Sequence, residues 1–276
     1  MSDERSLTPE EWRAWYTTQA GWTLQTRQWL YGEARLSQAR AVLEVGCGTG
    51  VIAAELAQLG DARVVGLDLN SSILDFARRQ GDGVTYVQGD AHELPFPDGA
   101  FDAVVCHYVF LWLADPVQGA REMARVVRRP EPAEGRPGGS VLACAEPDYG
   151  GRVDHPPELV PLGRLQAESL RRQGAEPEMG RRLGGIFAAA GLRTTVGTMA
   201  GYWNLTGPSI KRGSEAASPD ADFDAEWAMR ERDLAGLVSP EELRRLRSVD
   251  RHALEEGRRV LFVPTFYATG RKMPLP

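Results

Sequence analysis

The stretch Val42-Leu43-Glu44-Val45-Gly46-Cys47-Gly48-Thr49-Gly50 decides the fold of this chain of 276 residues. An apolar run typical of a strand leads into three glycines at alternate positions, and apolar residues at helical spacing follow from Val51. Such a turn offers backbone N–H groups at a helix N-terminus, and glycine lets a ligand approach the backbone without a Cβ atom in the way. The stretch therefore predicts a ligand-binding turn in an α/β protein.

The spacing of the glycines bears on the kind of ligand. A dinucleotide fingerprint, G-x-G-x-x-G, has its third glycine one position later, where this chain has Val51. The spacing thus weakens a nicotinamide-dependent oxidoreductase as an interpretation without excluding it. Taken alone, G-x-G-x-G is a weak signal.

Strand-like and helical patterns alternate along the chain after residue 40. Strands are predicted over residues 41–45, 63–68, 84–88, 101–106, 140–145, 193–203 and 259–267. Helices are predicted over residues 51–59, 71–80, 117–129, 158–173, 180–190, 223–237 and 240–256. This alternation predicts a Rossmann-like, doubly wound parallel sheet with helices on both faces.

The opening segment is helical and rich in tryptophan. Thr8 is an N-cap candidate, Pro9 follows at the first helical position, and Trp15, Trp22 and Trp29 recur at heptad spacing. These side chains fasten the N-terminal helices to the core, or they form a lid over a small-molecule cleft. We expect a lid segment over residues 1–40, a core over 41–203 and 258–276, and a mainly helical insertion over 204–257.

Composition and charge exclude several classes of protein. The longest uncharged apolar stretch, residues 103–114, is shorter than the roughly 18 to 20 residues of a membrane-spanning helix. The polar residues 1–11 do not resemble a secretory signal, so a cytoplasmic location and no membrane insertion are expected. Three isolated cysteines predict neither a disulfide framework nor a metal site.

The charge balance disfavours nucleic acid as a partner. The net charge is −6, from 38 acidic and 32 basic side chains, and most basic residues are arginines interspersed with Glu and Asp. We interpret the arginine doublets as solvated helix faces. The sequence leaves a monomer and a homodimer open.

Acidic side chains stand where the predicted strands end. Asp68 ends the second strand, Asp90 follows the third, and Cys106 with His107 ends the fourth. The carboxyl ends of parallel strands meet at one edge of a sheet, which is where such folds bind ligands. A carboxylate at the position of Asp68 can accept hydrogen bonds from two vicinal ribose hydroxyls.

From about Val42 to Pro147 the chain resembles the class I S-adenosylmethionine-dependent methyltransferases, especially the small-molecule subgroup that includes the ubiquinone and menaquinone biosynthesis C-methyltransferases. The glycine motif, Asp68, Gly89-Asp90-Ala91 and Pro137-Gly138-Gly139 carry the resemblance. It implies S-adenosylmethionine as the cofactor and a seven-stranded sheet whose last strand is antiparallel. It says little about the acceptor.

The resemblance also implies roles for individual residues. Glu44 and the turn of Gly46, Cys47, Gly48 and Gly50 border the methionyl part of the cofactor, with Cys47 as a small space-filling residue. The adenosyl part is contacted by Asp68 at the ribose, Leu69 at the adenine face, Asp90 at the adenine amine and the Ala91 N–H at a ring nitrogen.

Transfer of the activated methyl group is an in-line displacement, for which the protein mainly aligns the reactants and excludes water. Cys106 and His107 would face the methionyl end of the cofactor, and His107 is the candidate general base if the acceptor must lose a proton. Alternatively, His107 only forms a hydrogen bond in its turn. His92 and His252 are interpreted as surface residues. The candidates for lining the acceptor pocket are Trp12, Tyr16, Tyr108, Tyr149 and His155.

Three functions therefore compete. The first is a methyltransferase acting on a small-molecule acceptor. The second is a non-catalytic module that binds S-adenosylmethionine or S-adenosylhomocysteine. The third is the nicotinamide-dependent oxidoreductase, which the glycine spacing and the Gly89-Asp90-Ala91 element disfavour.

Overall fold

The computed structural model describes residues 7–130, 138–199 and 219–273, which form two compact units. The described residues of the first unit are 7–130, 138–147, 179–199 and 265–273, and those of the second are 148–178 and 219–264. Residues 148–178 therefore group with the helical segment that follows residue 218, whereas the sequence-based division assigned them to the core. The N-terminal helix belongs to the first unit.

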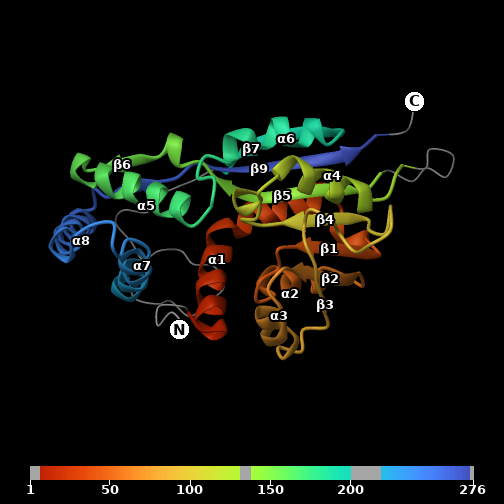
Figure 1. The fold of residues 1–276 in the computed structure, drawn as a ribbon, viewed down its shortest axis with the longest axis horizontal. Coiled ribbons are helices and arrows are strands. Elements are labelled where there is room, and N and C mark those ends of the chain that lie inside the picture. The colour runs from red at the N-terminus through yellow and green to blue at the C-terminus, as the bar shows by residue number, and fades with distance from the viewer. Residues whose placement is uncertain (1–6, 131–137, 200–218, 274–276) are drawn as a thin grey trace. The chain divides into compact units, whose positions relative to one another are not determined.

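A seven-stranded sheet forms the centre of the first unit (Figure 1). Its strand order is β3-β2-β1-β4-β5-β9-β7. The strands are β1 (Ala41–Val45), β2 (Arg63–Asp68), β3 (Thr85–Gln88), β4 (Ala103–Cys106), β5 (Ser140–Pro147), β7 (Leu192–Thr198) and β9 (Thr265–Lys272). The first five strands are parallel to one another, and β9 is antiparallel to both β5 and β7. The predicted Rossmann-like sheet with an antiparallel last strand is confirmed.

Helices cover both faces of this sheet. They are α1 (Pro9–Glu33), α2 (Val51–Ala57), α3 (Ser71–Arg78), α4 (Pro116–Val126) and α6 (Leu183–Ala189). Buried side chains of α1, α2 and α3 share one apolar cluster with β1, β2, β4 and β5. Helices α4 and α6 contact each other over the opposite face (Figure 1). Strands β4 and β5 are buried along their whole length, as their continuous apolar sequences predict.

Helix α1 begins as predicted and runs through Gly21 without a break. Thr8 and Glu11 form a reciprocal capping box at its start. Trp22 and Trp29 are 48% and 49% exposed, and Trp29 packs edge-on against Tyr267 with 5.3 Å between ring centroids. The tryptophans therefore lie beside the buried face of the helix and not within it.

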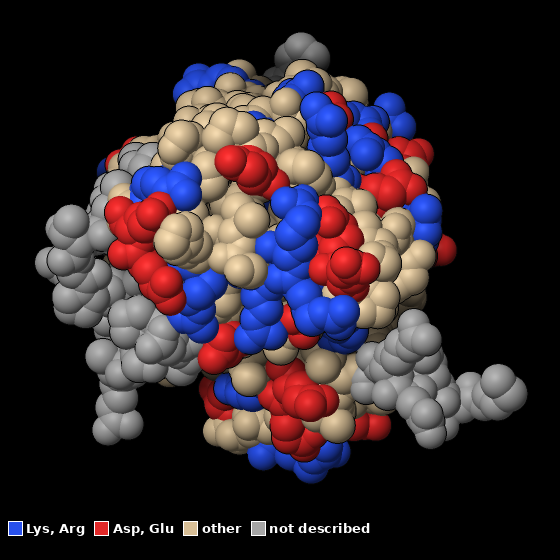
Figure 2. Space-filling model, turned by 90° about the vertical axis from the view of Figure 1, so that its left-hand side faces the viewer, with Lys and Arg blue, Asp and Glu red and all other residues tan. Residues whose placement is uncertain are grey.

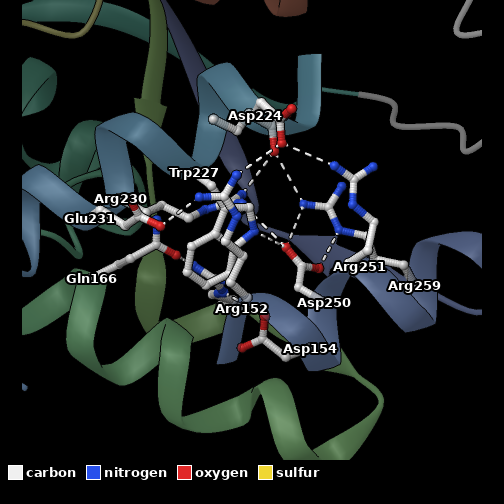
Figure 3. A network of polar contacts seen from close by, with 12 residues as sticks. Arg152, Asp154, Gln166, Asp224, Trp227, Arg230, Glu231, Asp250, Arg251 and Arg259 are labelled. Carbon is white, nitrogen blue, oxygen red and sulfur yellow. Dashed lines mark hydrogen bonds and ion pairs between the residues drawn. The ribbon is translucent and has the colours of Figure 1, made fainter. Parts of the chain in front are cut away.

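The second unit is mainly helical. It contains α5 (Val160–Arg172), α7 (Pro219–Asp233), α8 (Pro240–Glu255) and a small sheet of β6 (Val153–His155) and β8 (Val260–Phe262). Phe223 and Trp227 of α7 pack with Leu246 of α8 in its core. The fully buried Asp250 accepts hydrogen bonds from Trp227 Nε1 at 2.7 Å and Arg259 Nε at 2.6 Å (Figure 3). This polar network ties α7 and α8 together.

The prediction of a single strand over residues 259–267 is wrong. The structure has two strands there: β8, which pairs with β6, and β9, which lies in the main sheet. Pro264 stands between them and has no N–H group to continue a ladder, while its carbonyl accepts a hydrogen bond from the Asp148 N–H at 2.8 Å. The division coincides with the passage of the chain between the two units.

The strand predicted over residues 193–203 corresponds to β7. That strand spans Leu192–Thr198, and residues 200–203 lie outside the described part of the chain. Much of the predicted insertion, up to residue 218, lies outside it as well.

Basic and acidic side chains lie close together on the surface. Figure 2 shows clusters of Lys and Arg bordered by Asp and Glu on one face of the molecule. In the second unit, Arg247 pairs with Glu231 and with Asp224, and Arg245 pairs with Glu242. The pair of Arg245 with Glu242 fits the interpretation of the arginine doublets as solvated helix faces. The interpretation is wrong for Arg259 of the doublet Arg258-Arg259, whose side chain is 18% exposed and lies in the network of Asp250.

The described helices include none with the length and apolar character needed to cross a membrane. Within the described residues, the acidic, His and Cys side chains also form no group of three or more that is arranged to hold a metal ion. All three cysteines are buried thiols.

Candidate functional site

The three glycines after β1 form a turn that other side chains would not fit. Their φ angles are +70° at Gly46, +51° at Gly48 and +81° at Gly50, a region that favours glycine. A Cβ atom at these positions would lie 2.5 Å from Val109 Cγ2, 2.9 Å from Tyr16 Cε2 and 2.1 Å from Tyr86 Oη, respectively. The sequence motif thus corresponds to a turn enclosed by side chains from three other segments.

Asp68 joins this turn to the end of β2. Its Oδ2 accepts a hydrogen bond from the Gly48 N–H, and its Oδ1 accepts one from the Asn70 N–H, both at 2.9 Å. Each carboxylate oxygen retains a lone pair for a further donor. The next residue, Leu69, is 69% exposed and offers an apolar surface at the same edge of the sheet.

Glu44 is buried directly before the turn, and its Oε2 has no hydrogen-bond partner in the described part of the chain. Burial, and after it the negative charge of Asp68, raises the pKa of this carboxyl to about 8. A buried polar atom without a hydrogen-bond partner destabilises the fold unless a bound ligand supplies the missing hydrogen bond. The environment of Glu44 therefore fits the cationic amino group at the methionyl end of S-adenosylmethionine.

Asp90 and Ala91 follow β3 at the same edge. Asp90 Oδ1 accepts hydrogen bonds from both the backbone N–H and the ring Nδ1 of His92, at 2.8 and 2.7 Å. These bonds lower the pKa of the Asp90 carboxyl. The contact between Asp90 and His92 was not predicted from the sequence. A local signal was present, because an aspartate side chain often accepts a hydrogen bond from the backbone N–H two residues later, which is that of His92 here.

Cys106 ends β4 with its side chain fully buried, and its Sγ lies 3.7 Å from the Leu142 carbonyl oxygen of β5. Burial raises the pKa of the Cys106 thiol well above its usual range. The thiol is therefore protonated at neutral pH and packs between two strands. Its predicted contact with the methionyl end of the cofactor stays a prediction.

His107 is bound to the N-terminal helix. Its Nε2 lies 2.8 Å from Thr23 Oγ1 of α1. Burial, together with the nearby positive charge of Arg27, lowers the pKa of His107 to about 3. The ring is neutral at physiological pH and is a weak proton acceptor, so this environment favours the alternative role of His107 as a hydrogen-bonding residue.

Arg27 connects α1 to α2 below this contact. Its guanidinium is fully buried and donates to both carboxylate oxygens of Glu55, at 3.1 and 2.5 Å, and to the Ala20 carbonyl at 2.6 Å. Arg27 also donates to the Thr23 hydroxyl, which contacts His107. A continuous polar chain therefore runs from α2 through α1 to the end of β4.

The predicted acceptor-pocket residues of the N-terminal helix lie beside the glycine turn. Tyr16 packs over Gly48, Trp12 stacks on Tyr16 with 5.3 Å between ring centroids, and Arg13 donates to the Thr49 carbonyl at 2.6 Å. Helix α1 is thus held against the turn by a polar and an aromatic contact. These contacts fasten α1 to the first unit, and its role as a lid stays a prediction.

The other predicted acceptor residues are divided between the two units. Tyr108 adjoins His107, with 4.4 Å between ring centroids. Tyr149 and His155 belong to the second unit, where Tyr149 lines a cavity of about 270 Å³ and His155 ends β6. Arg152 and Arg164 line the same cavity.

Glu146 holds the segment that follows β4. The carboxylate is fully buried at the end of β5 and accepts hydrogen bonds from the N–H groups of Val109 and Phe110 at 2.8 Å and of Leu111 at 3.2 Å. Burial raises the pKa of Glu146 to about 7, while the three N–H donors act in the opposite direction. Because Val109 also packs on Gly46, Glu146 supports the glycine turn from behind.

Comparison with known proteins agrees with this arrangement. Residues 43–130 match the family model of the methyltransferase domain. A demethylmenaquinone methyltransferase of Deinococcus radiodurans is 40% identical over 100 residues, which cover 34% of this chain and 42% of that protein. A ubiquinone/menaquinone biosynthesis C-methyltransferase of Hahella chejuensis is 36% identical over 110 residues, 37% of this chain and 41% of that protein. The chain thus spans less than half the length of these relatives.

Solved structures share the fold at low sequence identity. The [4+2]-cyclase SpnF is 19% identical with a TM-score of 0.56, over 91% of this chain and 81% of that one. Phosphoethanolamine N-methyltransferase 2 of Haemonchus contortus, crystallised with S-adenosylhomocysteine, is 18% identical with the same TM-score, over 91% of this chain and 53% of that one. One fold thus serves a cyclase and a methyltransferase, so the residues of the site must decide the function.

Proposed function

We propose that this chain, which contains a class I S-adenosylmethionine-dependent methyltransferase domain, transfers the methyl group of S-adenosylmethionine to a small-molecule acceptor. One observation carries the proposal: Asp68 binds the glycine turn next to the buried, unpartnered Oε2 of Glu44. A carboxylate for ribose hydroxyls and a carboxyl for an ammonium group thus lie beside a turn whose three glycines have no Cβ atoms. This combination suits S-adenosylmethionine better than a nicotinamide dinucleotide.

The residues of the sheet edge would hold the cofactor along its length. We assign Asp68 to the ribose, Leu69 to a face of the adenine, Asp90 to the adenine amine, the Ala91 N–H to a ring nitrogen, and Glu44 to the methionyl amino group. When bound, the cofactor supplies a methyl group activated by a positively charged sulfur. The protein needs to align this group with the acceptor and to exclude water.

In this proposal, helix α1 excludes water from the methyl group of the bound cofactor. Tyr16 and Trp12 cover the glycine turn, and aromatic faces attract a sulfonium cation. His107 contributes through its bond to Thr23, which fixes α1 to the end of β4. Because a histidine with a pKa of about 3 is a weak base at neutral pH, we favour an acceptor atom that does not need His107 to remove its proton.

The small-molecule nature of the acceptor is supported by residue types and by relatives. The relatives reported above include one enzyme named for demethylmenaquinone and one named for ubiquinone and menaquinone biosynthesis. Trp12, Tyr16 and Tyr108 are aromatic residues of the first unit suited to an acceptor with an apolar portion, and Tyr149 and His155 remain candidates in the second unit.

Calorimetric titration of the purified protein with S-adenosylmethionine, S-adenosylhomocysteine and NADH tests the cofactor. We expect the two adenosyl sulfur compounds to bind and NADH not to bind. Asp68→Ala should weaken both by at least about tenfold because it removes charge-assisted hydrogen bonds to the ribose. Asp75→Ala, on the exposed surface of α3, is the matched control and should bind like the wild type.

Turnover separates an enzyme from a binding module. Incubation with methyl-labelled S-adenosylmethionine and a pool of small metabolites should transfer the label to a product and release S-adenosylhomocysteine. Tight binding without any label transfer would favour the binding module. Binding of NADH in place of the adenosyl sulfur compounds would overturn the proposal.

A further inference from the structure

His92 lies between two segments of the cofactor-binding edge, and both of its ring nitrogens are engaged. Its Nδ1 lies 2.7 Å from Asp90 Oδ1, on the segment after β3. Its Nε2 accepts a hydrogen bond from the backbone N–H of Asp115, at 3.2 Å. Asp115 is the N-cap residue of α4, so His92 bridges the end of β3 to the start of that helix.

These partners fix the tautomer of the ring. The Asp115 N–H can only donate, so Nε2 must be the unprotonated nitrogen that accepts. In the neutral ring the proton therefore sits on Nδ1, which donates it to the Asp90 carboxylate. A backbone amide, an imidazole and a carboxylate form one directed chain of hydrogen bonds.

The chain of hydrogen bonds leaves one oxygen of Asp90 for a ligand. The side-chain bonds that Asp90 makes within the described part of the chain, from the His92 N–H and Nδ1, all reach Oδ1. The Asp90 side chain is 54% exposed, and an exposed carboxylate held by a single contact would sample several rotamers. Two donors on Oδ1 fix the carboxylate plane, and with it the direction of Oδ2.

The segment around His92 is itself fixed to α4. Gln118 Nε2 donates to the His92 carbonyl at 3.1 Å, and the Leu94 N–H donates to Glu122 Oε2 at 2.8 Å. Gln118 and Glu122 lie one turn apart on the helix. The ring of His92 is therefore part of a frame built on a regular helix, which allows it to orient a neighbouring carboxylate.

We propose that His92 is a positioning residue that orients Asp90 to accept the exocyclic amine of the adenine ring, and so sets the preference for adenine over a 6-oxopurine. This inference rests on the proposed function, because it requires the adenosyl group at this edge. His92 does not contact the ligand and acts through Asp90. A 6-oxopurine has an acceptor oxygen where adenine has a donor amine, so a correctly oriented Asp90 rejects it.

The test compares S-adenosylhomocysteine with S-inosylhomocysteine, which carries the 6-oxopurine, by calorimetry on the intact protein. We expect the wild type to prefer the adenosyl compound. His92→Ala should weaken binding of the adenosyl compound by about tenfold, because the amine loses the oriented Oδ2. It should not weaken binding of the inosyl compound, because a carboxylate that is free to rotate can turn away from the 6-oxygen. The ratio of the two affinities should therefore fall.

Two further variants separate positioning from stability. His92→Asn keeps an N–H donor near the position of Nδ1 and should restore most of the preference. His252→Ala, an exposed histidine on α8, should leave it unchanged. If His92→Ala lost the same factor in affinity for both ligands, the ratio of the two affinities would not change. That result would overturn the role of His92 and leave the proposed function standing. Failure of the wild type to bind S-adenosylhomocysteine would overturn the proposed function as well.

Discussion

At the scale of single residues, Glu44 is the side chain whose charge state is most closely linked to the ligand. Its carboxyl has a pKa of about 8, because it is buried and lies near the negative charge of Asp68. In the free protein at pH 7 it is therefore mostly protonated. A ligand ammonium group at Oε2 would favour the carboxylate and displace the proton.

We therefore expect proton release when S-adenosylhomocysteine binds. Because the free protein holds the proton, rising pH favours the complex, and affinity should increase from about pH 6 to about pH 8 and then level off. Calorimetry at pH 7 in phosphate and in Tris, which differ in ionisation enthalpy, should give different binding enthalpies. Glu44→Gln should remove this difference, and identical enthalpies for the wild type would contradict the assignment.

The residues of the site differ in how far the sequence could predict them. The glycine turn and Asp68 follow from local spacing, because a tight turn needs glycine and a strand end has a fixed place in a parallel sheet. The state of His107 depends on Thr23, 84 residues earlier in the chain, and the state of His92 depends on Asp115. Contacts between distant segments leave no local pattern, so the burial of His107 and the bridging role of His92 were not foreseen.

At the scale of elements, the attachment of α1 rests on a buried ion pair. Arg27 is fully buried and Glu55 of α2 is its charged partner. An aliphatic residue at position 27 would fit the apolar pattern of the helix, so the arginine is not required for packing alone. Removing one member of a buried pair leaves the other charge uncompensated.

Arg27→Met should lower the free energy of unfolding by about 3 kcal/mol. The control is Arg172→Met on α5, whose pair with Glu168 is exposed and should cost about 0.5 kcal/mol or less. Both values are measured by urea denaturation. The double variant Arg27→Met with Glu55→Met should recover part of the loss. Equal effects of the two single variants would show that the pair does not hold α1.

Helices and strands were predicted well where hydrophobic periodicity is strong. They were predicted less well where the chain passes from one sheet to another. The starts of α2, α3 and α8 agree with the sequence patterns, because a glycine turn, Asn70 and Ser239 mark them. The apolar run over residues 259–267 shows no change of character at Pro264 beyond the proline itself. Periodicity describes burial and not the identity of the partner strand, so the division into β8 and β9 was not visible.

At the scale of the whole molecule, the chain passes between the two units several times. It leaves the first unit after Pro147, returns for residues 179–199 and returns again at Thr265. Composition changes little along these segments, which is why the sequence placed the boundary later. The proposed cofactor residues, from Glu44 to Ala91, all belong to the first unit.

Saturation with S-adenosylhomocysteine should therefore stabilise the first unit selectively. At a ligand concentration of about 100 times Kd, the gain is about 2.7 kcal/mol, so amides that exchange through opening of the whole first unit should slow by about 100-fold. Hydrogen exchange measured by mass spectrometry should show this in β1, β4 and β5, while α7 and α8 change little. Equal slowing in both units would contradict a site confined to the first.

The interior position of β9 has a consequence for the synthesis of the protein. Among the described strands of the sheet, β7 pairs only with β9, and β9 also covers the outer edge of β5. On the ribosome, β5 is complete after residue 147, yet its partner is complete only after residue 272. At about 5 to 20 residues per second, the nascent chain carries an open strand edge for roughly 6 to 25 s. We expect this interval to be the period in which the growing polypeptide depends most on chaperones.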